Sequence, residues 1–114
     1  MATREEAVMT EEKGYQGWTN YETWATSLWI DNEEPLYREA RKMARGARRK
    51  AAEQIEDGDK FPREARFILA DALKEWVEGM APDLGATLFS DLLNAALSAV
   101  DWLEIADAYF QEKR

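Results

Sequence analysis

The side chains that could do chemistry in this chain are carboxylates and cationic groups, because its 114 residues include no histidine and no cysteine. Without histidine the chain lacks the most common general base and the commonest transition-metal ligand. Without cysteine it has no disulfide, thiolate metal site or thiol nucleophile, which is typical of proteins in a reducing cytosol. Catalysis would depend on carboxylates, lysine, tyrosine or bound Mg²⁺. We therefore expect a protein that is not an enzyme and carries no cofactor.

The carboxylates fall into three sets, and each set has a structural and a functional interpretation. The structural interpretation is helix capping, turns and solubility, and it is the one we favour for the sets as a whole. The functional interpretation is a surface that mimics phosphates and binds the nucleic-acid site of a partner. Asp57-Gly58-Asp59 has the composition of a cation-binding turn, but the full calcium-loop pattern is missing, so no metal site is predicted. The sets are Asp31, Glu33 and Glu34; Glu53, Glu56, Asp57 and Asp59; and Asp101, Glu104 and Asp107.

The cationic residues are concentrated in one segment, since seven of the fifteen fall between Arg38 and Lys50. A basic stripe on one side of a helix can contact nucleic-acid phosphates. It can also be a solvated face that pairs with the surplus carboxylates. The net charge of −8 raises the electrostatic cost of approaching phosphates, which favours the second interpretation. The stripe consists of Arg38, Arg41, Arg45, Arg48 and Arg49.

The stretch Gly14–Asn32 holds three of the five tryptophans and two of the four tyrosines, so it is predicted to form part of a core or an interface. Thr19 and Glu22 have the spacing of a capping box, which predicts a helix over about residues 20–31. The aromatic residues before that helix, Tyr15 and Trp18, are the ones we expect to stay exposed as anchors for a partner. The residues predicted to pack as one apolar stripe are Tyr21, Trp24, Ala25, Leu28 and Trp29.

Four more helices are predicted, over about residues 35–55, 61–79, 84–97 and 101–110, and no segment shows the alternation of a strand. Pro35 suits a first helical position, and Asp101 with Glu104 repeats the capping-box spacing. The predicted fold is one all-α domain over residues 14–114, preceded by a mobile acidic tail at 1–13. The helix over 84–97 is the most apolar and is expected to be the most buried. The predicted core residues are Trp24, Leu28, Leu73, Trp76, Leu88, Leu92 and Ile105.

The composition is that of a soluble globular protein, with 46% hydrophobic and 33% charged residues. No apolar run approaches the length of a membrane-spanning helix, and the first residues lack the apolar segment of a signal peptide. The expected location is the cytoplasm of a bacterial host cell, with no membrane partner.

Residues Gly17–Trp24 read Gly-Trp-Thr-Asn-Tyr-Glu-Thr-Trp, and Leu28–Asn32 read Leu-Trp-Ile-Asp-Asn. With later segments at Leu73–Trp76 and Trp102–Ala106, these motifs resemble an uncharacterised family of small proteins that phages, plasmids and other mobile elements encode. The resemblance spans about residues 14–110. It implies a mobile-element origin and transfers no catalytic or binding role.

The favoured hypothesis is therefore a non-enzymatic interaction protein of mobile-element type that binds a host protein. Its expected role is counter-defence, in the manner of anti-CRISPR or anti-restriction proteins, against a nucleic-acid-handling system. The alternative is a small nucleic-acid-binding module that uses the arginine stripe, and a carboxylate–Mg²⁺ enzyme ranks third. The sequence leaves open whether one helical face is buried in a homodimer. The predicted partner-binding residues are Tyr15, Trp18, Asp31, Glu33 and Glu34.

Overall fold

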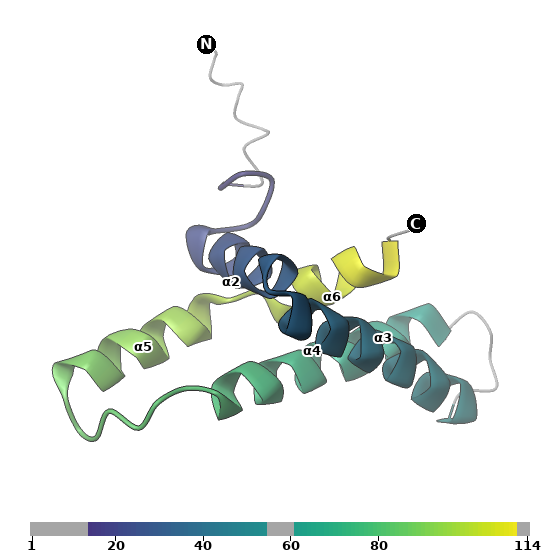
Figure 1. Ribbon diagram of the computed structural model, residues 1–114. Helices are drawn as coiled ribbons and strands as arrows, with labels where there is room; N and C mark the ends of the chain where they lie inside the picture. Colours follow the sequence, from purple (N-terminus) through teal and green to yellow (C-terminus); the bar gives the residue numbers. More distant parts are fainter. Residues whose placement is uncertain (1–13, 55–60, 112–114) are drawn as a thin grey trace, which may run out of the picture.

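The computed structural model describes residues 14–54 and 61–111, which form five helices and no strand (Figure 1). The predicted all-α single domain is confirmed. The predicted tail at residues 1–13 and the acidic turn at 56–59 lie outside the described residues. The helices are α2 (Tyr21–Asn32), α3 (Glu34–Gln54), α4 (Phe61–Gly79), α5 (Leu88–Ala99) and α6 (Trp102–Gln111).

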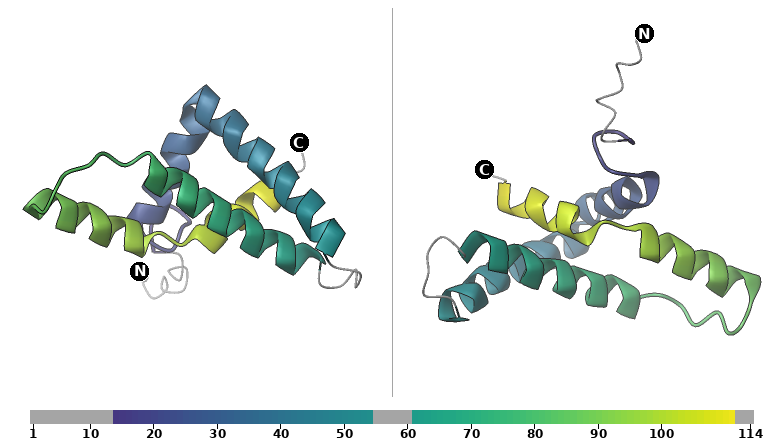
Figure 2. Two further views of the ribbon diagram at one scale, coloured as in Figure 1. Left: turned by 90° about the horizontal axis from the view of Figure 1, so that it is seen from below. Right: turned by 180° about the vertical axis from the view of Figure 1, so that it is seen from behind.

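Helices α3 and α4 contact each other more extensively than any other pair of the described helices. In Figure 2 they converge toward the end of α3 and the start of α4. The face of α3 toward the core consists of small side chains at helical spacing, Ala40, Ala44, Ala47 and Ala51, all at most 7% exposed. Small side chains let another helix approach closely. On α4, Leu69 and Leu73 are fully buried. The alanine-rich face that the sequence predicted for α3 is therefore part of the core.

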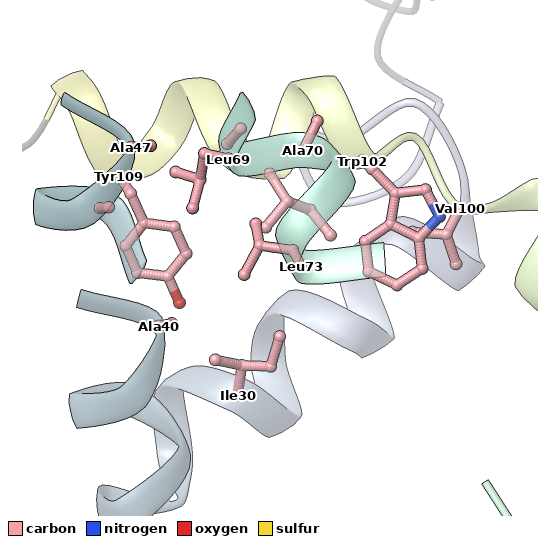
Figure 3. Packing of buried hydrophobic residues seen from close by; sticks show 12 residues of the cluster. Ile30, Ala40, Ala47, Leu69, Ala70, Leu73, Val100, Trp102 and Tyr109 are labelled. Atoms are coloured by element: carbon pink, nitrogen blue, oxygen red, sulfur yellow. The ribbon is translucent and has the colours of Figure 1, made fainter. Parts of the chain in front are cut away.

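Helix α6 completes the core by packing on α4, with further contacts to α2 and α3. Ile105 of α6 is fully buried and belongs to the same hydrophobic cluster as Leu69 and Leu73. Figure 3 shows the packing of this cluster. Leu73 and Ile105 were predicted as core residues, and both predictions are confirmed. Trp24 and Trp76, also predicted as core residues, are only half-buried.

The side of helix α2 that faces the core is not the apolar stripe that the sequence pattern emphasised. Its buried residues are Thr23, Ser27 and Ile30. The residues of the predicted apolar stripe are instead exposed or half-buried. The predicted cap is also wrong, because the N-cap is Asn20, whose side chain accepts from the backbone N–H of Thr23. The side chains of Thr23 and Ser27 are small, so this face lies close against the neighbouring helices.

Helix α5 is exposed, which overturns the prediction that it would be the most buried element. It contains no buried residue, and Leu88 and Leu92, expected in the core, are 64% and 58% exposed. The helix starts four residues later than predicted, where Thr87 and Ser90 form a capping box. The link at residues 80–87 carries the chain away from α4, and α5 extends from there with α2 as its main neighbour (Figures 1 and 2).

Among the helices described, none is long and apolar enough to cross a membrane.

Candidate functional site

A tight turn holds the first two predicted partner-binding residues together. The backbone N–H of Tyr15 donates to the carbonyl of Trp18 at 2.8 Å, and the N–H of Trp18 donates back at 2.7 Å. The two residues between them have positive φ angles, 48° at Gln16 and 88° at Gly17. This is the pattern of a type I′ turn, and glycine adopts such a φ without steric cost. The turn fixes where the Tyr15 and Trp18 side chains leave the backbone.

Three aromatic rings join this turn to the start of α2. The ring centroid of Tyr15 lies 5.3 Å from that of Tyr21 and 5.0 Å from that of Trp24, and Tyr21 and Trp24 are 5.6 Å apart. These separations are in the range of favourable aromatic pairs. Tyr15 remains 36% exposed and Tyr21 54% exposed. The cluster therefore holds the turn in place while it presents aromatic surface to solvent.

The same side of α2 continues this exposed surface to the end of the helix. Leu28 is 39% exposed and Trp29 is 66% exposed. We refer to Tyr21, Leu28 and Trp29 as the outer face of α2. Leu28 was predicted as a core residue, so its exposure is a correction, whereas for Tyr21 and Trp29 the sequence left core and interface open. Scattered exposed apolar residues are normal in proteins, whereas contiguous exposed apolar patches often mark binding sites.

Two shallow recesses flank the outer face. One, of about 220 Å³, is lined by Trp18, Trp24, Ser27, Leu28, Asp31 and Asn32. The other, of about 240 Å³, lies between α2, the start of α3 and the end of α4. Its lining is apolar apart from one threonine: Ala25, Thr26, Trp29, Ile30, Leu36, Val77 and Met80. The outer face is therefore a ridge between two hollows.

The structure brings some of the predicted partner-binding residues together and separates others. Trp18 and Asp31 line the first recess, and Tyr15 lies beside it against Trp24. Trp18, which was expected to stay exposed as an anchor, is half-buried and packs against the core cluster. Glu33 and Glu34 are exposed at the junction of α2 and α3, at the far end of α2 from the turn.

Asp31 and Glu34 also make contacts within the chain. The hydroxyl of Tyr109 donates to Asp31 Oδ1 at 2.7 Å, which joins α6 to α2. Arg38 pairs with Glu34 at 2.8 Å, one turn apart on α3, and both side chains are more than 70% exposed. Exposed ion pairs of this kind contribute little to stability, so Glu34 remains available to a partner.

A polar network sets the orientation of α2. The hydroxyl of Thr23 donates to Asn20 Oδ1 at 2.7 Å and accepts from the N–H of Asp101 at 2.9 Å. Asn20 Nδ2 donates to the carbonyl of Ala99 at 2.7 Å. These bonds satisfy backbone groups where α5 ends and α6 begins, and they require the polar side of α2 to face inward. The aromatic side of the helix therefore faces outward.

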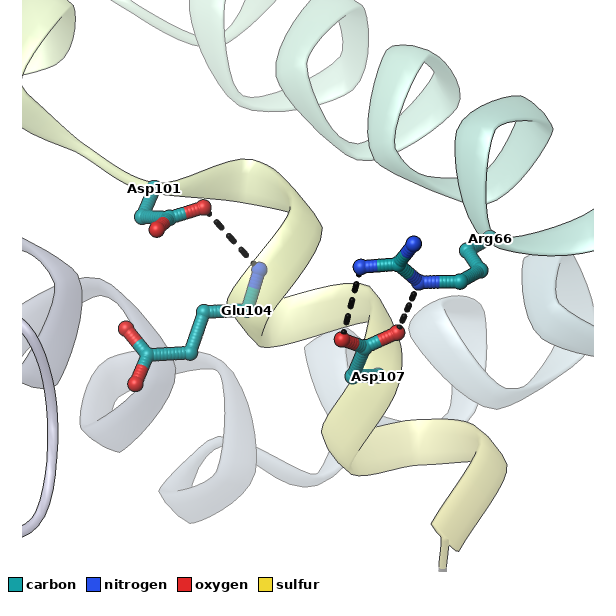
Figure 4. Close-up of polar contacts among 4 residues, drawn as sticks. All are labelled: Arg66, Asp101, Glu104 and Asp107. Carbon is teal, nitrogen blue, oxygen red and sulfur yellow. Dashed lines mark hydrogen bonds and ion pairs between the residues drawn. The ribbon is translucent and has the colours of Figure 1, made fainter. Parts of the chain in front are cut away.

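The carboxylates of α6 serve the fold, as the structural interpretation predicted (Figure 4). Asp101 caps the helix by accepting from the N–H of Glu104 at 3.1 Å. Glu104 accepts from the N–H of Thr19 at 3.1 Å, and the N–H of Asp101 donates to Thr23 Oγ1 at 2.9 Å. Asp107 accepts two hydrogen bonds from Arg66, and this contact raises the pKa of the Arg66 guanidinium above its ordinary value. Within residues 14–54 and 61–111, no group of three or more acidic residues is arranged to hold a metal ion.

Some arginines of the stripe on α3 contact aromatic side chains, and others are exposed to solvent. Arg41 donates to the hydroxyl of Tyr37 at 2.8 Å and its guanidinium lies 5.6 Å from the centre of that ring. Arg48 lies 4.8 Å from the centre of the Phe110 ring. Arg45 and Arg49 are exposed. A recess of about 300 Å³ is lined by Tyr37, Arg38, Arg41 and Arg45.

Sequence reasoning missed the outer face as a surface, although one signal was present. Thr23, Ser27 and Ile30 have helical spacing, and small hydroxyl residues suit a close contact between helices. The stronger aromatic pattern on the other side of the helix obscured that signal.

Comparisons with known proteins give one match. A family model described as a family of unknown function, DUF7249, matches residues 11–105. The matched range includes the Tyr15–Trp18 turn, helices α2 to α5 and the start of α6. No curated protein and no solved structure matches the chain.

Proposed function

Because the chain belongs to the DUF7249 family, whose function is unknown, we propose a function for it from the geometry of α2. The chain is a non-enzymatic interaction protein that binds a host protein through the outer face of this helix. The observation that carries the proposal is the exposure of Tyr21, Leu28 and Trp29, at 54%, 39% and 66%. Tryptophan and tyrosine are the residue types most often responsible for binding energy at protein interfaces.

The shape of this surface suits a protein better than a small molecule. Small-molecule pockets are usually concave and about 300–1,000 Å³ in volume. Here the recesses are about 220 and 240 Å³ and lie on either side of an exposed ridge. A ridge between two hollows fits a partner whose side chains enter the hollows while Trp29 enters the partner.

The charge of the molecule supports a cationic partner. The net charge is −8, and Asp31, Glu33 and Glu34 extend from the end of the outer face. Such a surface complements the basic nucleic-acid site of a protein in the host cytoplasm. Together with the resemblance to mobile-element proteins, this favours counter-defence by blocking that site, in the manner of anti-CRISPR or anti-restriction proteins.

One observation favours the second candidate, a nucleic-acid-binding module. Tyr37 and three arginines of α3 line a common recess, and arginines beside an aromatic ring can hold a nucleic-acid strand. Against it, Arg38 is paired with Glu34. The protein-binding function therefore remains the better supported of the two.

Capture from a bacterial host lysate, followed by titration with the purified partner, tests the proposal. Trp29→Ala should weaken binding by about thirtyfold, the effect of losing a typical hot spot. Phe67→Ala is the matched control, because Phe67 is an exposed aromatic residue on α4, at 43% exposure. The saturated partner should also lose its binding to nucleic acid. Equal binding by wild type and Trp29→Ala would contradict the proposal.

A further inference from the structure

Helix α5 is as apolar as a buried helix, but its large apolar side chains are exposed to solvent. Leu88, Phe89 and Leu92 are 64%, 64% and 58% exposed. Only one of the twelve residues of α5, Asp91, is charged, although a third of the whole chain is charged. Helix faces that contact water usually carry charge. The composition therefore indicates that this face has an apolar partner.

The exposed residues of α5 follow the spacing of a coiled-coil seam. Leu88, Leu92, Ala95 and Ala99 are separated by four, three and four residues, the a and d positions of a heptad. All four are exposed. We call these four residues the α5 seam. Leu93 and Leu97, on another side of the helix, are half-buried, and Leu97 packs against the core.

We propose that the α5 seam binds a second copy of this chain, through antiparallel pairing of two α5 helices about a two-fold axis. The seam is self-complementary in this arrangement because it carries bulky side chains in its first half and small side chains in its second half. Leu88 and Leu92 of each copy face Ala99 and Ala95 of the other. Phe89, beside the seam, faces the small Ala96.

The antiparallel arrangement also places no like charge against the one charged residue of α5. Asp91 flanks the seam, immediately before Leu92. In the antiparallel pairing, Asp91 of one copy faces the polar and small residues near Ser98 of the other. The only charge on α5 is then compatible with a dimer.

The exposed area is sufficient for a dimer of modest affinity. At the exposures given above, the three large side chains offer roughly 350 Å² of apolar surface on each copy. With the alanines and the flanking atoms, the pairing would bury about 1,000 Å² in total, the lower limit for a specific interface. We therefore expect a dissociation constant on the order of 10 µM. The outer face of α2 contributes no residue to the seam, so a dimer would carry two such faces.

Sedimentation equilibrium of the full chain over about 1–200 µM, a range that brackets the expected dissociation constant, tests the proposal. The average mass of the wild type should rise from 13.1 kDa toward twice that value. Leu92→Glu should remain a monomer across the range, and Ala95→Glu should do so independently at the other half of the seam. Asn94→Glu is the control, because it adds the same charge to α5 on a side away from the seam and should still dimerise.

Circular dichroism shows whether a monomeric variant has lost only the interface or the whole fold. If Leu92→Glu is unfolded, the oligomeric state of Ala95→Glu tests the proposal in its place. A wild type that stays monomeric at the highest concentration overturns the proposal. Self-association that the two seam variants leave unchanged, or that Asn94→Glu abolishes equally, overturns it as well. If the chain remains monomeric and Leu92→Glu instead prevents binding of the captured host protein, the seam belongs to that protein and the proposal is wrong.

Discussion

Thr23 Oγ1 accepts a hydrogen bond of 2.9 Å from the backbone N–H of Asp101, a residue 78 positions later in the sequence. The bond links the first turn of α2 to the start of α6. Because the Thr23 side chain is fully buried, water cannot replace it as the acceptor. This contact requires the polar side of α2 to face inward, and the orientation of the aromatic residues follows from it.

Thr23→Val is expected to lower the free energy of unfolding by about 1–3 kcal/mol, because the isosteric side chain leaves the part-buried N–H of Asp101 without its acceptor and removes the hydrogen bond to Asn20 Oδ1. Thr26→Val is the control. The Thr26 hydroxyl donates to Glu22 within its own helix, so its loss should cost less than about 0.5 kcal/mol. Urea denaturation measures both. Equal effects would mean that the bond to Asp101 does not stabilise the orientation of α2.

Leu73→Ala is expected to lower the free energy of unfolding by about 2–5 kcal/mol, because Leu73 is fully buried and its truncation leaves a cavity. Leu92→Ala, which truncates the same kind of side chain at 58% exposure, should cost less than about 1 kcal/mol. Both are measured by urea denaturation at about 1 µM, below the expected dimer dissociation constant. A large loss of stability in Leu92→Ala would indicate that α5 packs into the core of the monomer.

Arg66→Gln and Asp107→Asn should each lower the free energy of unfolding by about 1 kcal/mol. The two hydrogen bonds of the pair favour a larger effect, but both side chains are about one-third exposed, and solvent weakens the interaction. The pKa of Arg66 is raised by its hydrogen bond to Asp107. A cation whose pKa is raised on folding contributes stability at all pH values below its unfolded pKa and loses it only as pH rises through the folded one. Titration of Arg66 should therefore leave stability unchanged between about pH 6 and 9. A double-mutant cycle in urea at those two pH values checks the coupling, and zero coupling would contradict it.

Free DNA and RNA are expected to bind negligibly near 150 mM salt, because the net charge of −8 opposes the approach of phosphates. Fluorescence anisotropy over a salt series measures this. If submicromolar binding occurs, replacing Arg41, Arg45 and Arg48 with glutamine should reduce the slope of affinity against salt, since each phosphate contact releases counterions. Arg63→Gln, an exposed arginine on α4, is the control. Binding that the triple variant abolishes and the control retains would establish the alternative function.

Calorimetric titration with Zn²⁺ is expected to show no submicromolar site, because the chain has neither histidine nor cysteine. Asp107 and Asp101 are also engaged in the ion pair and the helix cap. A stoichiometric site would point to a carboxylate cluster, and Asp57→Asn with Asp59→Asn would identify whether the acidic turn forms it.

The candidate site was predictable only in part. Tyr15 and Asp31 were expected at a partner surface, and the turn and the first recess bring them close to α2. Trp29, the most exposed of the large hydrophobic side chains described, was predicted as part of the apolar stripe and was not among the predicted partner-binding residues. A helical stripe shows that one side of a helix is apolar, but not that this side is buried, since solvent exposure depends on what the remaining chain can cover.

The sequence by itself determined where the helices lie. Helix α4 has the predicted bounds, and the bounds of α3 differ by one residue at each end. Periodicity and capping depend on residues within a few positions of each other, so they can be read locally. For the same reason, the apolar faces that contain the α3 alanines, Leu73 and Ile105 were predictable, and the packing of α3, α4 and α6 on one another then buries them.

Only the tertiary structure decided which sides of α2 and α5 face solvent. For α2, the decisive contacts are those of Asn20 and Thr23 with backbone groups near residue 100. These contacts place Thr23, which is fully buried, toward the core, and the Tyr21 and Trp29 side chains then lie on the opposite side of the helix. For α5, the link at residues 80–87 carries the chain away from α4, so that Leu97 near the end of the helix packs against the core while Leu88 and Leu92 stay exposed. Both outcomes depend on residues far apart in sequence, and local patterns do not contain that information.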